Sequence, residues 1–209
     1  MNSELHWEGI YRTKAPDAVS WYRPHLDRSL GLIERAAEGR SARIVDVGAG
    51  ESTLVDDLVA RGYEHISVLD ISPTALEVTK QRLGIAAARV NLVCADVMRS
   101  PFPRHCFDIW HDRAVFHFLT SPQDRAAYVQ SVRRNVRPGG HVIVSTFGPE
   151  GPTRCSGLEV MRYDAGALHG QFGSSFRLVD SAKEVHYTPW GTGQQFTYCY
   201  CKVEDSSVA

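Results

Sequence analysis

Two glycines early in the chain form a loop that can hold a ligand. The stretch DVGAGEST, residues 46–53, follows a short apolar run, and its turn residues are Asp46, Gly48, Ala49 and Gly50. Glycines between a strand and a helix let the backbone come close to a bound molecule. A dinucleotide-binding loop would continue with glycine or alanine at position 53, where this chain has threonine. The spacing therefore weakens the case for a dinucleotide.

Two acids follow at the ends of later apolar runs. Asp70 ends HISVLD, 20 residues after Gly50, where a carboxylate can accept hydrogen bonds from both hydroxyls of a ribose. Asp96, in VCADV, stands where a carboxylate can accept from an adenine amino group. The glycine loop and the two acids together outline an adenosine site without a clear phosphate cradle.

Candidates for proton transfer cluster after a fourth apolar run, and they are His111, Asp112 and His117. An imidazole near neutrality can accept a proton from an amine, thiol or hydroxyl. One helical turn after Asp112 would bring it and His117 toward the same cavity. Structural roles stay open as alternatives: His111 capping a strand, His117 packing under aromatic side chains, and Asp112 pairing with Arg113 or with a ligand's ammonium group.

Short β-type runs alternate with helical patterns between residues 43 and 147, which predicts a parallel sheet with right-handed crossovers. Strands are expected at 43–47, 65–70, 90–94, 107–111 and 141–147, and helices at 53–61, 72–83 and from 121 to about 137. After a further helix at 163–171, two long runs at 176–186 and 194–203 predict an antiparallel hairpin. The expected fold class is α/β: a Rossmann-like, doubly wound, mostly parallel seven-stranded sheet that ends in this hairpin.

Five segments resemble, in order, the motifs of class I, seven-stranded S-adenosylmethionine-dependent methyltransferases. They are RIVDVGAGEST, VLDIS, CADV, FDIWHDRAVFHFL and RPGGHVIVS, between residues 43 and 147. The resemblance implies that Asp46, Gly48 and Gly50 lie near the methionine part of S-adenosylmethionine and that Ala49 also belongs to the residues that bind it. It also implies that Asp70 binds the ribose, Ile71 packs on the adenine, and Asp96 and Val97 meet the adenine edge. Ser52 departs from the third glycine of many members.

The first forty residues add a second resemblance. HWEGIYRTKAPDAVSWY, followed by Asp112 and Arg113 after the fourth strand, is similar to the branch of methyltransferase-like proteins that modify protein lysines. That branch carries a second acid where this chain has His117. The aromatic residues of this segment, Trp7, Tyr11, Trp21 and Tyr22, suggest a flap over the site. We assign to a substrate pocket the residues Trp21, Tyr22, Arg113 and Cys155.

Composition excludes several classes of partner. The formal net charge of −1 gives no general attraction to nucleic acid or to an anionic membrane, and no apolar stretch has the length of a membrane span. The five cysteines lack paired metal-ligand spacing, so we expect no metal site and a cytoplasmic location. We expect a single domain over 1–209, with a flap at 1–40, a core at 41–203 and a tail at 204–209.

The hypothesis is an S-adenosylmethionine-dependent methyltransferase that acts on a nitrogen, sulfur or oxygen atom of a small or mid-sized acceptor and releases S-adenosylhomocysteine. A protein lysine methyltransferase is the alternative within enzymes. A non-catalytic protein that binds an adenosine ligand is the alternative from another class, and a nicotinamide-dependent oxidoreductase is a weaker one. The sequence does not indicate an oligomeric state.

Overall fold

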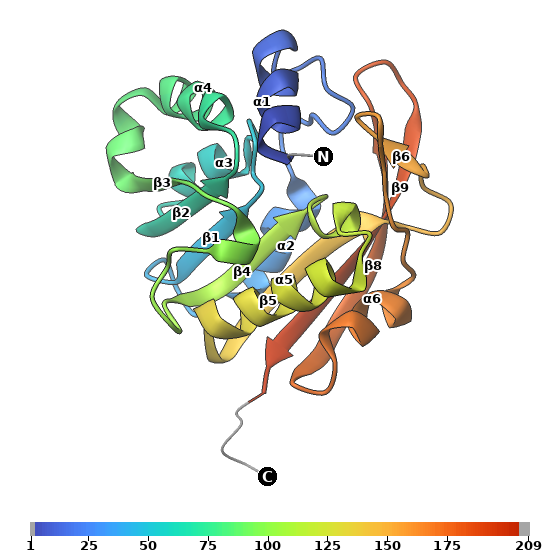
Figure 1. The fold of residues 1–209 in the computed structure, drawn as a ribbon. Helices are drawn as coiled ribbons and strands as arrows, with labels where there is room; N and C mark the ends of the chain where they lie inside the picture. Colours follow the sequence, from blue (N-terminus) through green and yellow to red (C-terminus); the bar gives the residue numbers. More distant parts are fainter. Residues whose placement is uncertain (1–2, 205–209) are drawn as a thin grey trace.

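A seven-stranded sheet runs through the computed structural model, which describes residues 3–204 (Figure 1). The strand order is β3-β2-β1-β4-β5-β9-β8. The strands are β1 (Arg43–Val47), β2 (His65–Asp70), β3 (Val90–Cys94), β4 (Phe107–Arg113), β5 (Val136–Phe147), β8 (Phe176–Tyr187) and β9 (Gly193–Val203). The first five pair in parallel, while β9 is antiparallel to β5 and to β8. The predicted α/β sheet with a C-terminal antiparallel hairpin is confirmed.

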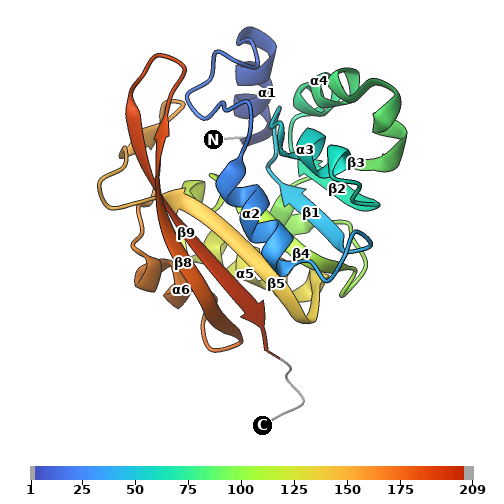
Figure 2. The ribbon, with the colours of Figure 1, turned by 180° about the vertical axis from the view of Figure 1, so that it is seen from behind.

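Helices cover both faces of this sheet. They are α1 (Ser3–Thr13), α2 (Asp27–Ala36), α3 (Leu54–Ala60), α4 (Pro73–Leu83), α5 (Pro122–Asn135) and α6 (Ala165–Phe172). Apolar residues of α2 and α3 pack on one face, and those of α5 and α6 pack on the other. Figure 1 shows α5 and α6 in front of the sheet, and Figure 2 shows α2 from behind. Side chains that alternate along a strand therefore enter two separate cores.

Local sequence signals explain where two of the helices begin. The hydroxyl of Ser72 accepts from the backbone N–H of Ala75 at 3.2 Å, and Pro73 occupies the first turn of α4. The hydroxyl of Ser121 accepts from the backbone N–H of Asp124 at 3.1 Å at the start of α5. A serine cap followed by proline satisfies a free N–H and preorganises the first turn.

The structure differs from the expected elements at both edges of the sheet. The fourth strand continues to Arg113 instead of ending at His111. The fifth begins at Val136 instead of His141, next to a register shift between Phe107 and Ile109 that accommodates the proline and glycines of RPGG. A short hairpin, β6 (Arg154–Cys155) and β7 (Leu158–Glu159), was not predicted, and 3₁₀ helices lie at Gly84–Arg89, Val97–Arg99 and Phe116–Phe118.

Within residues 3–204, no helix has the length and apolarity needed to cross a bilayer. Of the predicted tail at 204–209, only Glu204 belongs to the described part of the chain, and its N–H donates to the carbonyl of Ser175 at 2.9 Å. Residues 205–209 lie outside the described residues, as do residues 1–2 of the predicted flap.

Candidate active site

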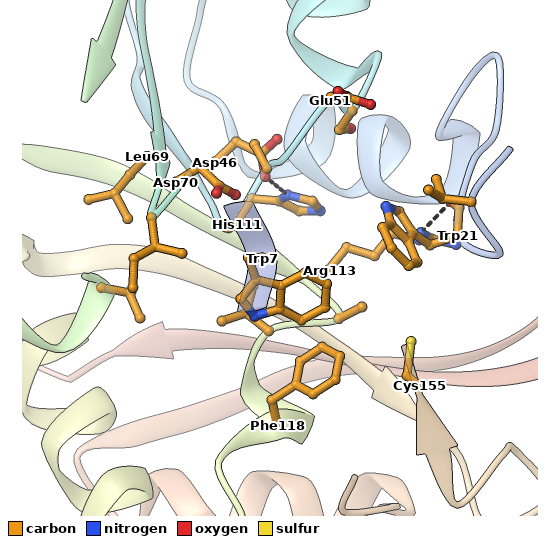
Figure 3. A pocket seen from close by; sticks show the side chains of 18 of the residues that line it. Trp7, Trp21, Asp46, Glu51, Leu69, Asp70, His111, Arg113, Phe118 and Cys155 are labelled. Carbon is orange, nitrogen blue, oxygen red and sulfur yellow. Dashed lines mark hydrogen bonds and ion pairs between the residues drawn. The ribbon is translucent and has the colours of Figure 1, made fainter. Parts of the chain in front are cut away.

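A cavity opens where β1, β2 and β4 end, and the N-terminal segment covers it (Figure 3). Strand ends at the carboxyl edge of a parallel sheet point toward the same space, which is why ligands bind there in open α/β folds. Most of the predicted donor-site residues line this cavity: Asp46, Gly48, Ala49, Asp70, Ile71, Asp96 and Val97. The predicted pocket residues Trp21, Tyr22, Arg113 and Cys155 and the predicted proton acceptor His111 line it as well.

The glycine loop is tied to the acid at the end of β2. The backbone N–H of Gly50 donates to Asp70 Oδ2 at 2.7 Å, and that of Ser72 donates to Asp70 Oδ1 at 2.8 Å. Burial raises the pKa of Asp70 to about 6, against the lowering effect of these N–H groups. Gly50, with φ 55°, is not among the residues that line the cavity, and a Cβ there would meet the hydroxyl of Tyr11.

His111 forms a buried pair with Asp46. The two residues are register partners on β4 and β1, and His111 Nδ1 lies 2.7 Å from Asp46 Oδ1. Beside a carboxylate, a neutral imidazole carries its proton on Nδ1 and keeps the lone pair on Nε2 for another partner. Both Nε2 and Asp46 Oδ2 are buried without a partner among the described residues. The pair thus offers the cavity an oriented proton acceptor.

Glu51 adds a buried carboxyl group that the sequence reasoning missed. Its side chain is 5% exposed and lines the cavity, and neither oxygen has a hydrogen-bond partner in residues 3–204. Burial raises its pKa to about 7, the charge of Arg82 lowers it, and the charge of Asp70 raises it further. Buried carboxyl groups without partners are unfavourable when ionised, so Glu51 is suited to a cationic ligand.

Aromatic side chains cover the cavity from α1 and the loop after it. The Trp7 ring lies 5.0 Å from that of Phe118 and 6.0 Å from that of Trp21, and Tyr11 lies 6.4 Å from Trp21. Trp21 was predicted as a pocket residue, whereas Trp7 and Tyr11 were noted only as part of an aromatic segment. Their spacing of four residues on one helix was the available signal, since it places both on one face.

Glu8 fastens α1 to the first turn of α4. Its carboxylate accepts from the hydroxyl of Ser72 at 2.6 Å and from the hydroxyl of Thr74 at 2.5 Å. These hydrogen bonds lower the pKa of Glu8 to about 2, and Arg12 donates to the same carboxylate at 2.8 Å. A carboxylate at a helix N-terminus is also favoured by the free N–H groups there. The N-terminal segment over the cavity is therefore held in place by aromatic contacts and by the hydrogen bonds of Glu8.

Asp112 lies on the other face of the sheet from His111. Its carboxylate accepts from the hydroxyl of Tyr128 at 2.5 Å and from the backbone N–H groups of Val115 and Phe116. Burial raises the pKa of Asp112 to about 6. Because neighbours on a strand alternate between faces, only one of His111 and Asp112 can face the cavity. These contacts give Asp112 a structural role in shaping the turn after β4.

His117 is buried beneath β5 and does not line the cavity. Its Nδ1 accepts from the backbone N–H of Phe147 at 3.2 Å, so its lone pair is already used. Burial and the charge of Arg113 lower its pKa to about 3, which keeps the ring neutral. The structure therefore does not bring Asp112 and His117 together at one cavity, as the sequence led us to expect. Catalytic roles for these two residues stay predictions.

Three comparisons with known proteins agree with this geometry. A family model described as a methyltransferase domain matches residues 45–144. A relative from Danio rerio, EEF1A lysine methyltransferase 2, is 23% identical over 160 residues, which cover 70% of this chain and 69% of that protein.

Two solved structures share the fold. One comes from a study of the conversion of a disulfide bond into a thioacetal group during echinomycin biosynthesis: its TM-score is 0.79 at 17% identity, covering 98% of this chain and 95% of that one. The other is 1,6-didemethyltoxoflavin-N1-methyltransferase from Burkholderia thailandensis with S-adenosylhomocysteine bound. Its TM-score is 0.67 at 21% identity, covering 97% of this chain and 84% of that one.

Proposed function

The chain belongs to the class I S-adenosylmethionine-dependent methyltransferases, and we propose that it methylates a nitrogen, sulfur or oxygen atom of a small or mid-sized acceptor inside the covered cavity. S-adenosylmethionine is its methyl donor. The observation that carries the choice of acceptor is the free Nε2 of His111, held by Asp46 beneath an aromatic cover. An enclosed proton acceptor fits a molecule that the cavity can surround.

The lining fits a donor that carries a sulfonium and an ammonium cation. Asp46 Oδ2 and both oxygens of Glu51 are buried acceptors without partners in the described chain, and they are the kind of group that a bound cation satisfies. Asp70 would accept from the ribose hydroxyls and Asp96 from the adenine amino group. Two apolar side chains, Ile71 and Val97, would pack on the adenine. When bound, the donor supplies a methyl group that is open to in-line displacement.

His111 would remove the acceptor's proton when the acceptor carries one. The acceptor's lone pair forms the new bond to the methyl carbon, and the electron pair of the broken carbon–sulfur bond stays on sulfur. The proton moves to His111 Nε2, and Asp46 stabilises the resulting imidazolium through Nδ1. The remaining contribution of the chain is alignment and exclusion of water, since methyl transfer from a sulfonium needs no stronger acid or base.

A protein lysine is the second candidate acceptor. The observations that favour it are the relative from Danio rerio, which is named as a lysine methyltransferase, and Asp112 and Arg113 in the motif after β4. Against it stands the aromatic segment over the cavity, because a lysine on a folded protein needs an unobstructed channel. Nucleic acid is disfavoured by the net charge of −1, and the five free thiols suit the cytoplasm.

Label transfer in a cell lysate separates these acceptors. Purified protein is incubated with lysate and a donor that carries a radioactive methyl group, and small molecules are then separated from proteins. We expect label in the small-molecule fraction, reduced at least tenfold by His111→Gln and unchanged by His65→Gln, an exposed histidine at the start of β2. Label confined to protein bands would contradict a small acceptor and support the lysine alternative.

A further inference from the structure

Arg113 has an unused pair of donors in the cavity. Its Nη1 donates to the carbonyl oxygen of Trp21 at 3.2 Å, and its guanidinium carbon lies 4.5 Å from the centre of the Phe196 ring (Figure 3). Its Nε and Nη2 are shielded from solvent and lack a hydrogen-bond partner within residues 3–204. The side chain is thus fixed at one nitrogen and on one face, while the rest of its hydrogen-bonding capacity is unused.

The charge of Arg113 is also uncompensated. Arg23, which lines the same cavity, donates to a Glu184 oxygen at 2.7 Å, whereas no carboxylate of the described chain forms an ion pair with Arg113. A guanidinium stays protonated at any pH that a folded protein tolerates. Holding such a charge away from water without a counter-charge is unfavourable. An anionic ligand would supply both the counter-charge and the missing acceptors.

The two free nitrogens define the shape of that anion. Nε–H and the adjacent N–H of Nη2 point in parallel from one edge of the guanidinium plane. Their spacing matches the two oxygens of a carboxylate, which can accept both hydrogen bonds at once. Because Nη1 is held by Trp21 and the ring of Phe196 lies against one face, this edge is oriented before any ligand arrives.

The position of Arg113 assigns it to the acceptor half of the cavity. In the sheet order, β2 with Asp70 lies on one side of β4, and β9 with Phe196 lies on the other. Figure 3 shows Asp70 to one side of His111 and the end of the Arg113 side chain, beside Trp21, to the other. His111 and Arg113 are two residues apart on β4, so their side chains leave the same face.

The walls around this edge are aromatic, and they include Trp7, Trp21, Phe118, Phe147 and Phe196. Such walls bind flat apolar rings through stacking and edge contacts. Building on the proposed function, we propose that Arg113 binds a carboxylate of the methyl acceptor through Nε and Nη2, and that the acceptor is a small aromatic acid. Arg113 is then a specificity-determining residue, while His111 receives the proton.

Matched acids and amides test this proposal without knowledge of the natural acceptor. Protein saturated with S-adenosylhomocysteine is titrated with benzoate, 1-naphthoate and indole-3-carboxylate, and with the primary amide of each, by calorimetry and by tryptophan fluorescence. We expect at least one acid to bind ten or more times more tightly than its amide. Arg113→Gln should abolish that preference without changing affinity for the amide. Arg177→Gln, which removes an exposed arginine of β8, should leave the preference unchanged.

Three results would overturn the proposal. The first is equal binding of every acid and its amide to the unaltered protein, a comparison that needs no variant to fold. The second is an acid preference that persists in Arg113→Gln. The third is an Arg113→Gln variant that loses affinity for S-adenosylhomocysteine but keeps it for 5′-methylthioadenosine, since Arg113 would then hold the carboxylate of the donor. Failure of the unaltered protein to bind S-adenosylhomocysteine would instead reject the proposed function.

Discussion

Glu51 should make the ligand-free protein less stable as the pH rises, and Glu51→Gln should remove that effect. The carboxyl group is 5% exposed, its oxygens have no partner in residues 3–204, and burial raises its pKa from 4.5 to about 7. A raised pKa in the folded state means that folding favours the protonated form. The stability linked to Glu51 is therefore fully present below pH 4.5 and is lost as the pH rises through about 7.

The size of the effect follows from the two pKa values. The interval between 4.5 and about 7, at about 1.4 kcal/mol for each pH unit, amounts to about 3 kcal/mol. Most of this loss of stability occurs between pH 5 and pH 8. We therefore expect the difference in the free energy of unfolding between Glu51→Gln and the unaltered protein to grow by about 2–3 kcal/mol over that range, in favour of the variant.

Urea unfolding followed by tryptophan fluorescence measures this difference at several pH values without donor. The contributions of the other titrating groups to the free energy of unfolding cancel in this difference, because both proteins carry the same groups. Glu64→Gln, which changes an exposed glutamate, is the matched control and should show a difference that is constant with pH. A constant difference for Glu51→Gln as well would refute the reasoning, since Glu51 would then be ionised in the folded protein with no penalty.

Three further substitutions test the elements around the cavity. Glu8→Gln removes the charge and leaves one acceptor oxygen for the hydroxyls of Ser72 and Thr74, so α1 should exchange its amide hydrogens faster. Because the pKa of Glu8 is lowered to about 2, its stabilising effect should be present above pH 4.5 and vanish as the pH falls toward 2. Ala114→Gly should stabilise the protein by about 1 kcal/mol in urea unfolding, because Ala114 has φ 73°, which is unfavourable for a residue with a Cβ; equal or lower stability would contradict this. Tyr128→Phe leaves Asp112 without its hydroxyl donor and should destabilise by about 1–3 kcal/mol, and a change below about 0.5 kcal/mol would show that the bond is not needed.

The sequence was sufficient to bring the residues that we assign to the donor to one cavity, because their positions depend on the order of neighbouring strands. Gly48 and Asp70 sit at the ends of successive strands, and parallel strands with right-handed crossovers bring such ends to one edge of a sheet. The pattern of apolar runs is enough to place them. The same logic assigned Asp96 to the adenine edge, and that residue lines the cavity.

The residues on the other side of the cavity could not be placed from the sequence, because their positions depend on tertiary packing that no local sequence pattern contains. Whether His111 or Asp112 faces the cavity is decided by which core each face of β4 packs against, and a strand buried on both faces does not reveal this. His117 fell outside the lining because a 3₁₀ turn at Phe116–Phe118 places it under β5. The contact of Glu8 with Ser72 joins residues 64 positions apart, so only tertiary packing shows it.

Calorimetric titration with S-adenosylmethionine and S-adenosylhomocysteine tests the central claim most directly, with NAD as the control ligand. We expect micromolar binding of the first two, about −8 kcal/mol, and no binding of NAD. Asp70→Asn should weaken both by at least tenfold, since it removes the carboxylate that we propose accepts from the ribose hydroxyls. Absence of binding to the unaltered protein, or equal affinity in Asp70→Asn, would contradict the assignment of this cavity to the methyl donor.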